Sequence, residues 1–341
     1  MSDIPLERES APAPEEKPKK KKHPILISIV CLFTIAFIAV LIFFGQDIVD
    51  YISGLDYQPT SEMASIFEKL KFTWRGELIA RAAHPVFETA DSFNHDCPID
   101  SGDTATLGCY MPESNRIYIY DIRSDELNGI KESVLAHEVM HAVFNRLDGF
   151  EKKNIESELK AFYESHESEY EKYMGTYPEE QFYTELHSII GQRVHYKDLS
   201  EPLQKHYSKY FLDLDAVVNY YDQYHEIIDD LLEKIEKSGK ELETLHAELV
   251  AKRDDYNVRL DEYNKDVAYH NEQVELGNYN EERYQSLKKR QAALDAEYVE
   301  INQFIDDYNG KVQKYEDLLA RQKQLYGEMD SRRDIQKEES L

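Results

Sequence analysis

Glycine, proline and cysteine are scarce in this chain, which has 13, 11 and 3 of them among 341 residues. So few turn-forming residues disfavour an all-β or loop-rich protein and favour long helices. Three cysteines are too few for a small protein held together by disulfides. Basic residues are outnumbered as well: 40 Lys and Arg stand against 67 Asp and Glu, a net charge of −27. This balance argues against nucleic-acid binding, which needs a basic surface.

Long apolar runs are also absent, with one exception at residues 24–44. A helix of these 21 uncharged residues would be about 31 Å long, close to the ~30 Å hydrocarbon core of a bilayer. Five lysines lie within residues 17–23, just before it. The positive-inside rule therefore predicts a single-pass membrane anchor that contacts the lipid bilayer, with a cytoplasmic N-terminus and extracytoplasmic C-terminal domains. A cleaved signal peptide is the alternative, but its apolar region should span only about 7–15 residues.

The pattern on either side of the anchor divides the chain further. Residues 1–23 are predicted to be a disordered basic tail, and 45–212 to be one domain. In 213–341, apolar and aromatic residues recur at alternating spacings of three and four, as in a coiled coil. Gly277 suits a helix end, and Asn278 with Glu281 resembles a capping box. We therefore expect two antiparallel helices; the alternative is one continuous helix that pairs with another chain.

A metal-binding pattern lies in residues 131–149, which read KESVLAHEVMHAVFNRLDG. A helix stacks His137 and His141 one turn apart on one face, where two imidazoles can bind one Zn²⁺ ion. Glu138 lies beside them and can reach a water molecule at the metal. The alternative is a pair of solvated histidines, which fits an apolar helix poorly because a buried, unpaired Glu138 would be costly.

Two histidines need a third protein ligand, and we expect Glu185. Its segment, residues 179–194, is rich in apolar side chains, so this carboxylate should be buried and in need of a cation. Glu158 and Glu164 are the alternatives, although their segment is polar on nearly all sides. Four residues are candidates for the donor that stabilises an oxyanion: Tyr183, His187, His195 and Tyr196.

Two further features concern the segment before the metal motif. Residues 115–122 have a β-rich composition, and an edge strand there could hold an extended peptide by strand addition; an internal strand is the alternative. Cys97 and Cys109 lie 12 residues apart and could form a disulfide in an oxidising exterior, with two free thiols as the alternative.

The pattern His137-Glu138-x-x-His141, a strand before it and a later helical Glu185 resemble the zincin metallopeptidases, in particular the gluzincin branch and its uncharacterised bacterial membrane-anchored members. The resemblance covers about 95–212. It implies a compact α+β fold, zinc held by the two histidines and Glu185, and Glu138 as general base. Gluzincins often carry an acidic residue four positions after the third ligand; here that position is Ile189.

The sequence thus predicts a membrane-anchored extracytoplasmic zinc metallopeptidase that hydrolyses a protein or peptide substrate and carries a C-terminal coiled-coil hairpin. Two alternatives belong to other classes. One is a catalytically inactive zinc-fold scaffold. The other is a coiled-coil protein that contacts an envelope protein partner and whose histidine motif is accidental.

Overall fold

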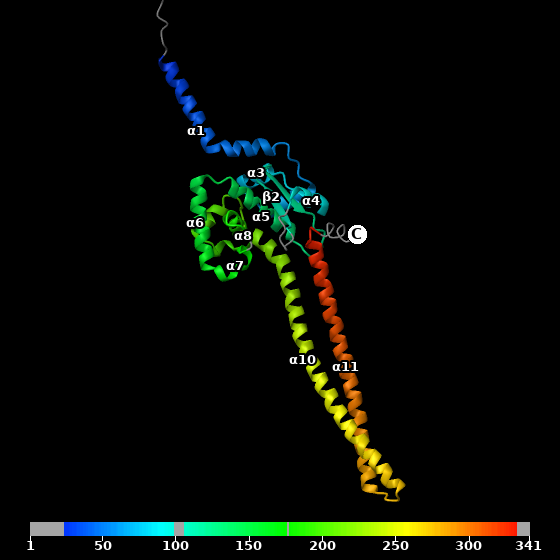
Figure 1. The fold of residues 1–341 in the computed structure, drawn as a ribbon. Coiled ribbons are helices and arrows are strands. Elements are labelled where there is room, and N and C mark those ends of the chain that lie inside the picture. The colour runs from blue at the N-terminus through cyan, green and yellow to red at the C-terminus, as the bar shows by residue number, and fades with distance from the viewer. Residues whose placement is uncertain (1–23, 99–105, 176, 333–341) are drawn as a thin grey trace, which may run out of the picture. The chain divides into compact units, whose positions relative to one another are not determined.

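The computed structural model describes residues 24–98, 106–175 and 177–332 of the chain. These residues are mostly helical, with one small three-stranded sheet, in keeping with the expected α+β class (Figure 1). By its internal contacts the chain divides into Met1–Val49 and Asp50–Leu341. The expected hairpin therefore belongs to the same unit as the domain that precedes it. The predicted tail at 1–23 lies outside the described residues.

The first helix, α1, spans Pro24–Gly54 and includes the apolar run. Within the part of the chain that the structure describes, no helix combines the length and the apolarity that crossing a bilayer requires. The anchor expected over residues 24–44 therefore has no support from the structure.

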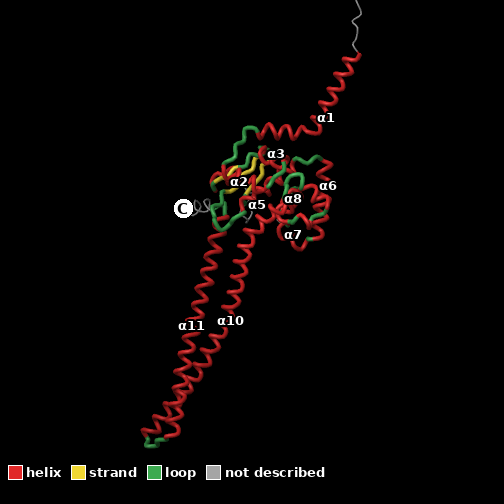
Figure 2. Tube along the Cα trace, turned by 180° about the vertical axis from the view of Figure 1, so that it is seen from behind, coloured by secondary structure: helices red, strands yellow, loops and turns green. Residues whose placement is uncertain are grey.

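The sheet has the strand order β1-β3-β2. Strand β1 (Val86–Glu88) pairs with β3 (Arg116–Tyr120) in parallel, and β2 (Gly108–Met111) pairs with β3 in antiparallel orientation. Figure 2 shows the three strands as a small patch among the helices. The central strand β3 buries Ile117 and Ile119 completely, as expected for a strand with neighbours on both sides.

Helix α5 (Ile130–Asn145) lies at the centre of the domain and contacts α2, α3, α8, α10 and the strands β2 and β3. Its apolar positions Leu135, Val139, Met140 and Val143 are completely buried. The helix ends at Asn145, and Gly149 is the first residue of the next helix, α6. The remaining helices of the domain are α2 (Ser61–Leu70), α3 (Trp74–Ala82), α4 (Ala90–Asp96), α6 (Gly149–Ser165), α7 (Glu167–Met174), α8 (Phe182–Arg193), η1 (Tyr196–Asp198) and α9 (Glu201–Tyr207).

The tail forms two long helices, α10 (Leu214–Glu275) and α11 (Glu281–Met329), which lie side by side in Figures 1 and 2. A turn joins them where the backbone of Gly277 adopts a φ of 82°, a conformation that glycine takes without strain. The Asn278 N–H donates to the carbonyl of Gln273, so the turn satisfies a free carbonyl at the helix end. The cap of the second helix is Asn280, whose side chain accepts from the Arg283 N–H. The expected cap at Asn278 was wrong by two residues.

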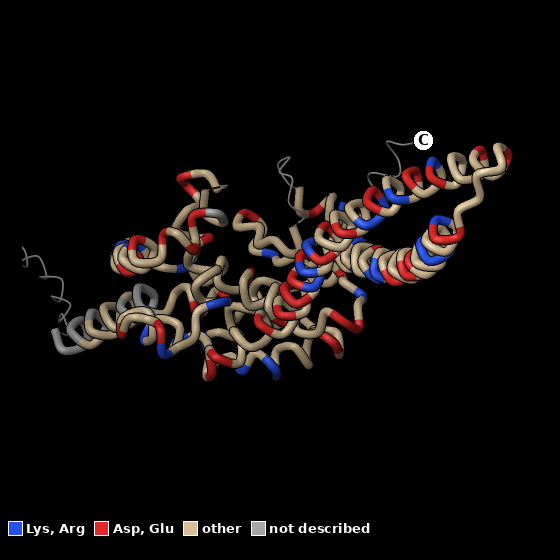
Figure 3. The backbone as a smooth tube through the Cα atoms, turned by 90° about the horizontal axis from the view of Figure 1, so that it is seen from below, with Lys and Arg blue, Asp and Glu red and all other residues tan. Residues whose placement is uncertain are grey.

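The two helices meet along part of the predicted seam, where Leu287, Leu294 and Ile301 are buried. Tyr298, at another seam position, is 57% exposed. Charged residues of both signs are interspersed along both helices (Figure 3). The end of α11 returns to the domain, where the Ser331 hydroxyl donates to the carbonyl of Thr106.

Candidate metal centre

The first half of the site comes from α5. His137 and His141 are one helical turn apart, and their side chains are 17% and 12% exposed. The rest of this helix is fixed by burial on most sides, so the two imidazoles have a rigid support.

The second half of the site comes from α8. Glu185 lies in its first turn, and its side chain is 14% exposed. The other end of the helix is tied to α5, because the Gln192 side-chain amide donates to both the carbonyl and the hydroxyl of Ser133. Ile189 and Ile190 are buried between these ends. The orientation of α8 toward α5 is therefore set by packing and by buried hydrogen bonds.

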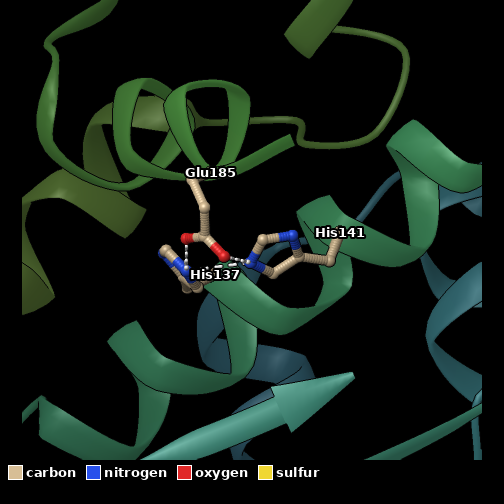
Figure 4. A group of neighbouring side chains, drawn as sticks. All are labelled: His137, His141 and Glu185. Atoms are coloured by element: carbon tan, nitrogen blue, oxygen red, sulfur yellow. Dashed lines mark hydrogen bonds and ion pairs between the residues drawn. The ribbon is translucent and has the colours of Figure 1, made fainter. Parts of the chain in front are cut away.

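The three side chains converge on one point (Figure 4). Nε2 of His137 lies 3.1 Å from Nε2 of His141 and 3.6 Å from Oε2 of Glu185, and Nε2 of His141 lies 3.5 Å from Oε1 of Glu185. Ligands at about 2.0–2.1 Å from a tetrahedral zinc ion lie about 3.3–3.4 Å from one another. The two distances to Glu185 involve its two different oxygens, and one ligand atom from each of the three residues lies within 4.8 Å of the others, so the group could hold a metal ion.

Burial and the neighbouring charges shift the pKa values of the three side chains in different directions. Burial alone would lower the pKa of His137, but hydrogen bonding to Glu185 and the charge of Glu138 raise it above the usual value. Burial, with the nearby His137, lowers the pKa of His141 to about 4. Burial would raise the pKa of Glu185, yet its histidine neighbours hold it below the usual range. The Nε2–H of His137 can thus donate toward both partners, and a cation would replace this proton.

Two neighbours of the ligands were missed by sequence reasoning. Nδ1 of His141 lies 2.9 Å from the Thr184 hydroxyl, a bond that fixes the ring and leaves Nε2 to face the metal position. The Tyr177 hydroxyl bonds to the Glu185 carboxylate, and burial raises its pKa to about 12, with the Glu185 charge adding to the effect. Neither residue belongs to a recognisable motif: Tyr177 lies in the loop before α8, and Thr184 lies in the first turn of that helix.

Glu138 lies on the side of α5 that faces strand β2. It is 5% exposed, it accepts a hydrogen bond from the Tyr110 backbone N–H, and burial raises its pKa to about 7. The strand can approach this closely because residue 108 is glycine. A Cβ atom there would lie 2.9 Å from Oε1 of Glu138 and 2.6 Å from a methyl carbon of Val134.

The alternative ligands lie elsewhere. Glu158 accepts a hydrogen bond from the Ser200 hydroxyl, and Glu164 pairs with Lys160 within its own helix. The structure thus groups Glu185, rather than either of these, with the two histidines.

The four expected oxyanion donors have other contacts. His187 is completely buried and lies 2.8 Å from Nε2 of His206. His195 contacts Asp215 on α10, and the backbone N–H of Tyr196 donates to the same carboxylate. The ring of Tyr183 packs edge-on against Phe182. The Tyr177 hydroxyl, by contrast, bonds to Glu185 of the candidate site.

The strand expected at the edge of the sheet is in fact central. Residues 116–120 form β3, which has a neighbour on each side, so the expected peptide-binding edge at 115–122 was wrong. The strand beside the metal helix is β2, at the sheet edge. Cys97 and Cys109 are joined by a disulfide, with their Cα atoms 6.2 Å apart, which links the end of α4 to β2.

Comparison with known proteins adds no relative: no family model, no curated protein and no solved structure matches this chain. The resemblance to zincins therefore remains a prediction that is based on the residues of the motif.

Proposed function

We propose that this chain is a zinc-dependent metallopeptidase whose metal ligands are His137, His141 and Glu185. The observation that carries the proposal is the convergence of two imidazoles and one carboxylate, whose ligand atoms lie within 4.8 Å of one another. Two nitrogen donors and one oxygen donor are a common set for catalytic zinc, and three protein ligands leave one position open.

When bound, zinc supplies a Lewis acid that lowers the pKa of a water molecule toward ~7. The chain itself supplies the proton transfer. Glu138 directly follows a ligand, is shielded from solvent and has a pKa of about 7, as suits a general base at neutral pH. Its carboxylate accepts the proton of the attacking water and returns it to the leaving amide nitrogen. The Tyr177 hydroxyl, which bonds to Glu185, could donate a hydrogen bond to the oxyanion.

The proposed substrate is a protein or peptide. The proposal keeps the membrane anchor at 24–44 and an extracytoplasmic site, on the strength of the five lysines before the apolar run. It also assigns the antiparallel hairpin of α10 and α11, as a coiled coil, to contact with an envelope protein partner. Protease accessibility of the intact membrane tests the topology: cleavage of α10 from the extracytoplasmic side is expected, and protection there contradicts it.

Zinc content and peptide cleavage, measured on the full chain, separate the proposal from its alternatives. We expect about one zinc ion per chain, with cleavage abolished in Glu138→Gln although zinc remains bound. His141→Ala should lose zinc. Glu158→Gln is the matched control, because this carboxylate lies outside the site and should keep both zinc and activity.

The outcomes point to different functions. Stoichiometric zinc without cleavage by the unaltered chain would favour the inactive scaffold. Absence of zinc in the unaltered chain, with no change in His141→Ala, would favour a coiled-coil interaction protein and end the enzyme proposal.

A further inference from the structure

The last turns of α1 are attached to the domain by polar contacts. The Asp50 carboxylate accepts two hydrogen bonds from Arg146, and both side chains are almost fully buried. The Ser53 hydroxyl donates to the carbonyl of Ala82. Gly54 packs closely against α3, where an added Cβ would lie 3.3 Å from Cβ of Arg81. One face of this short segment is thus buried although it carries polar residues.

The opposite face carries large apolar side chains and is exposed. Tyr51, Ile52 and Leu55 retain 58%, 61% and 64% of their surface. Tyr51 and Ile52 lie about 100° apart on the helix, the width of a typical apolar stripe, and Leu55 directly follows the last helical residue, Gly54. This arrangement reverses the usual one, in which a helix turns its apolar side to the protein.

We infer that this exposed stripe, Tyr51, Ile52 and Leu55, lies in the interfacial region of a lipid bilayer. An apolar face on a helix that runs parallel to a membrane is covered by the boundary between headgroups and acyl chains. Continuity of the chain argues for this occupant, because the 21-residue apolar run at 24–44 ends only six residues before Asp50. Tyrosine in the stripe fits as well, since its ring suits the headgroup level.

A polar cavity of about 280 Å³ adjoins the stripe. Ile52 lines it together with Ser53, Asp56, His84 and Arg116. Apolar side chains next to a guanidinium group and several hydrogen-bonding groups match the two layers of a membrane surface, acyl chains and phosphate headgroups.

The net charge of the chain after the apolar run indicates which lipids the stripe should bind. Residues 45–341 contain 34 Lys and Arg against 62 Asp and Glu, so an anionic bilayer would repel this part of the chain. The stripe should therefore bind zwitterionic phospholipid through apolar contact, and high salt should leave the contact unchanged. This inference shares the membrane prediction with the proposed function but does not depend on its chemistry.

Tryptophan quenching in the full chain tests the contact. The chain has one tryptophan, Trp74, so the Trp74→Phe variant has no tryptophan fluorescence and serves as the parent for the test variants. A single tryptophan is then introduced into this parent as Ile52→Trp or Leu55→Trp. The fluorescence of each variant is measured in vesicles of phosphatidylcholine brominated near the headgroup. Phe150→Trp is the matched control, because Phe150 is 77% exposed at the start of α6. Phe37→Trp, within the apolar run, is measured in vesicles of phosphatidylcholine brominated near the ends of the acyl chains and reports on the anchor alone.

We expect Ile52→Trp and Leu55→Trp to lose most of their fluorescence at low and high salt, while Phe150→Trp keeps its fluorescence. Thermal unfolding of each variant checks that it folds like the parent. If Phe37→Trp is quenched but both stripe variants behave like Phe150→Trp, the stripe does not contact lipid and the inference is wrong, while the anchor survives. If Phe37→Trp is also unquenched, both the anchor and the stripe are refuted, and the zinc chemistry is untouched.

Discussion

The buried ion pair between Asp50 and Arg146 is the contact whose loss should be most costly. The side chains are 2% and 7% exposed, and the guanidinium group bonds to both carboxylate oxygens, at 2.8 and 2.9 Å. It also donates to the Asn115 side chain and to the carbonyl of Ala142. Four of the five N–H groups of Arg146 are thus directed at protein acceptors.

Replacement of Asp50 by Asn keeps the shape but leaves the arginine charge buried without a counterion. Removal of one partner of such a pair costs about 3–5 kcal/mol of unfolding free energy. For a unit of this size, 1 kcal/mol corresponds to about 2–3 °C, so the Tm should fall by roughly 6–15 °C. Differential scanning calorimetry of the full chain measures the shift.

The matched comparison is the double variant Asp50→Leu with Arg146→Met. It removes both charges, so its Tm should return most of the way to that of the unaltered chain. Glu77→Gln is a second control, because its pair with Arg81 is exposed and contributes only about 0.3–0.5 kcal/mol. A fall of less than about 2 °C in Asp50→Asn would refute the reasoning, since it would mean that water reaches the pair.

Three other predictions follow from single positions. Gly108→Ala should reduce peptide cleavage and lower the free energy of unfolding by about 1–3 kcal/mol, because the added methyl group meets the proposed general base. Gly149→Ala should change neither quantity, because no atom lies within 4 Å of the added Cβ. Equal effects of the two substitutions would contradict this packing. Burial and a neighbouring carboxylate raise the pKa of Glu88 from 4.5 to about 7. Between pH 4.5 and about 7 the Glu88 carboxyl is therefore still protonated in the folded chain but already ionised in the unfolded chain. The free energy of unfolding should fall as the pH rises through this range. Denaturant titrations should show that Glu88→Gln removes this fall. Leu294→Ala should lower the melting temperature that circular dichroism measures for the helices, because this side chain is buried. Leu319→Ala should lower it less, because Leu319 is 37% exposed. A larger fall in Leu319→Ala than in Leu294→Ala would contradict the observed seam.

Helical periodicity predicted much of the fold. The apolar spacing around His137 and His141 indicated a buried helix, and the structure has one. Glu185 could be chosen because a lone carboxylate in an apolar helix needs a partner, which is a property of composition alone. The turn at Gly277 could be found because glycine marks a helix end.

Features set by long-range contacts could not be predicted in the same way. Strand β3 is central because β1, some thirty residues earlier, pairs with it, and nothing in residues 115–122 reveals that neighbour. Tyr177 reaches Glu185 only through the path of the loop between α7 and α8. Gly108 permits the approach of β2 to Glu138, which is invisible until both elements have been placed.

X-ray absorption at the zinc edge, on the full chain, tests the central claim most directly. The account predicts one zinc ion per chain, bound by two imidazole nitrogens and at least one carboxylate oxygen at about 2.0–2.2 Å, and loss of this signal in His137→Ala. A chain without stoichiometric zinc, or a zinc ion without imidazole ligands, would contradict it.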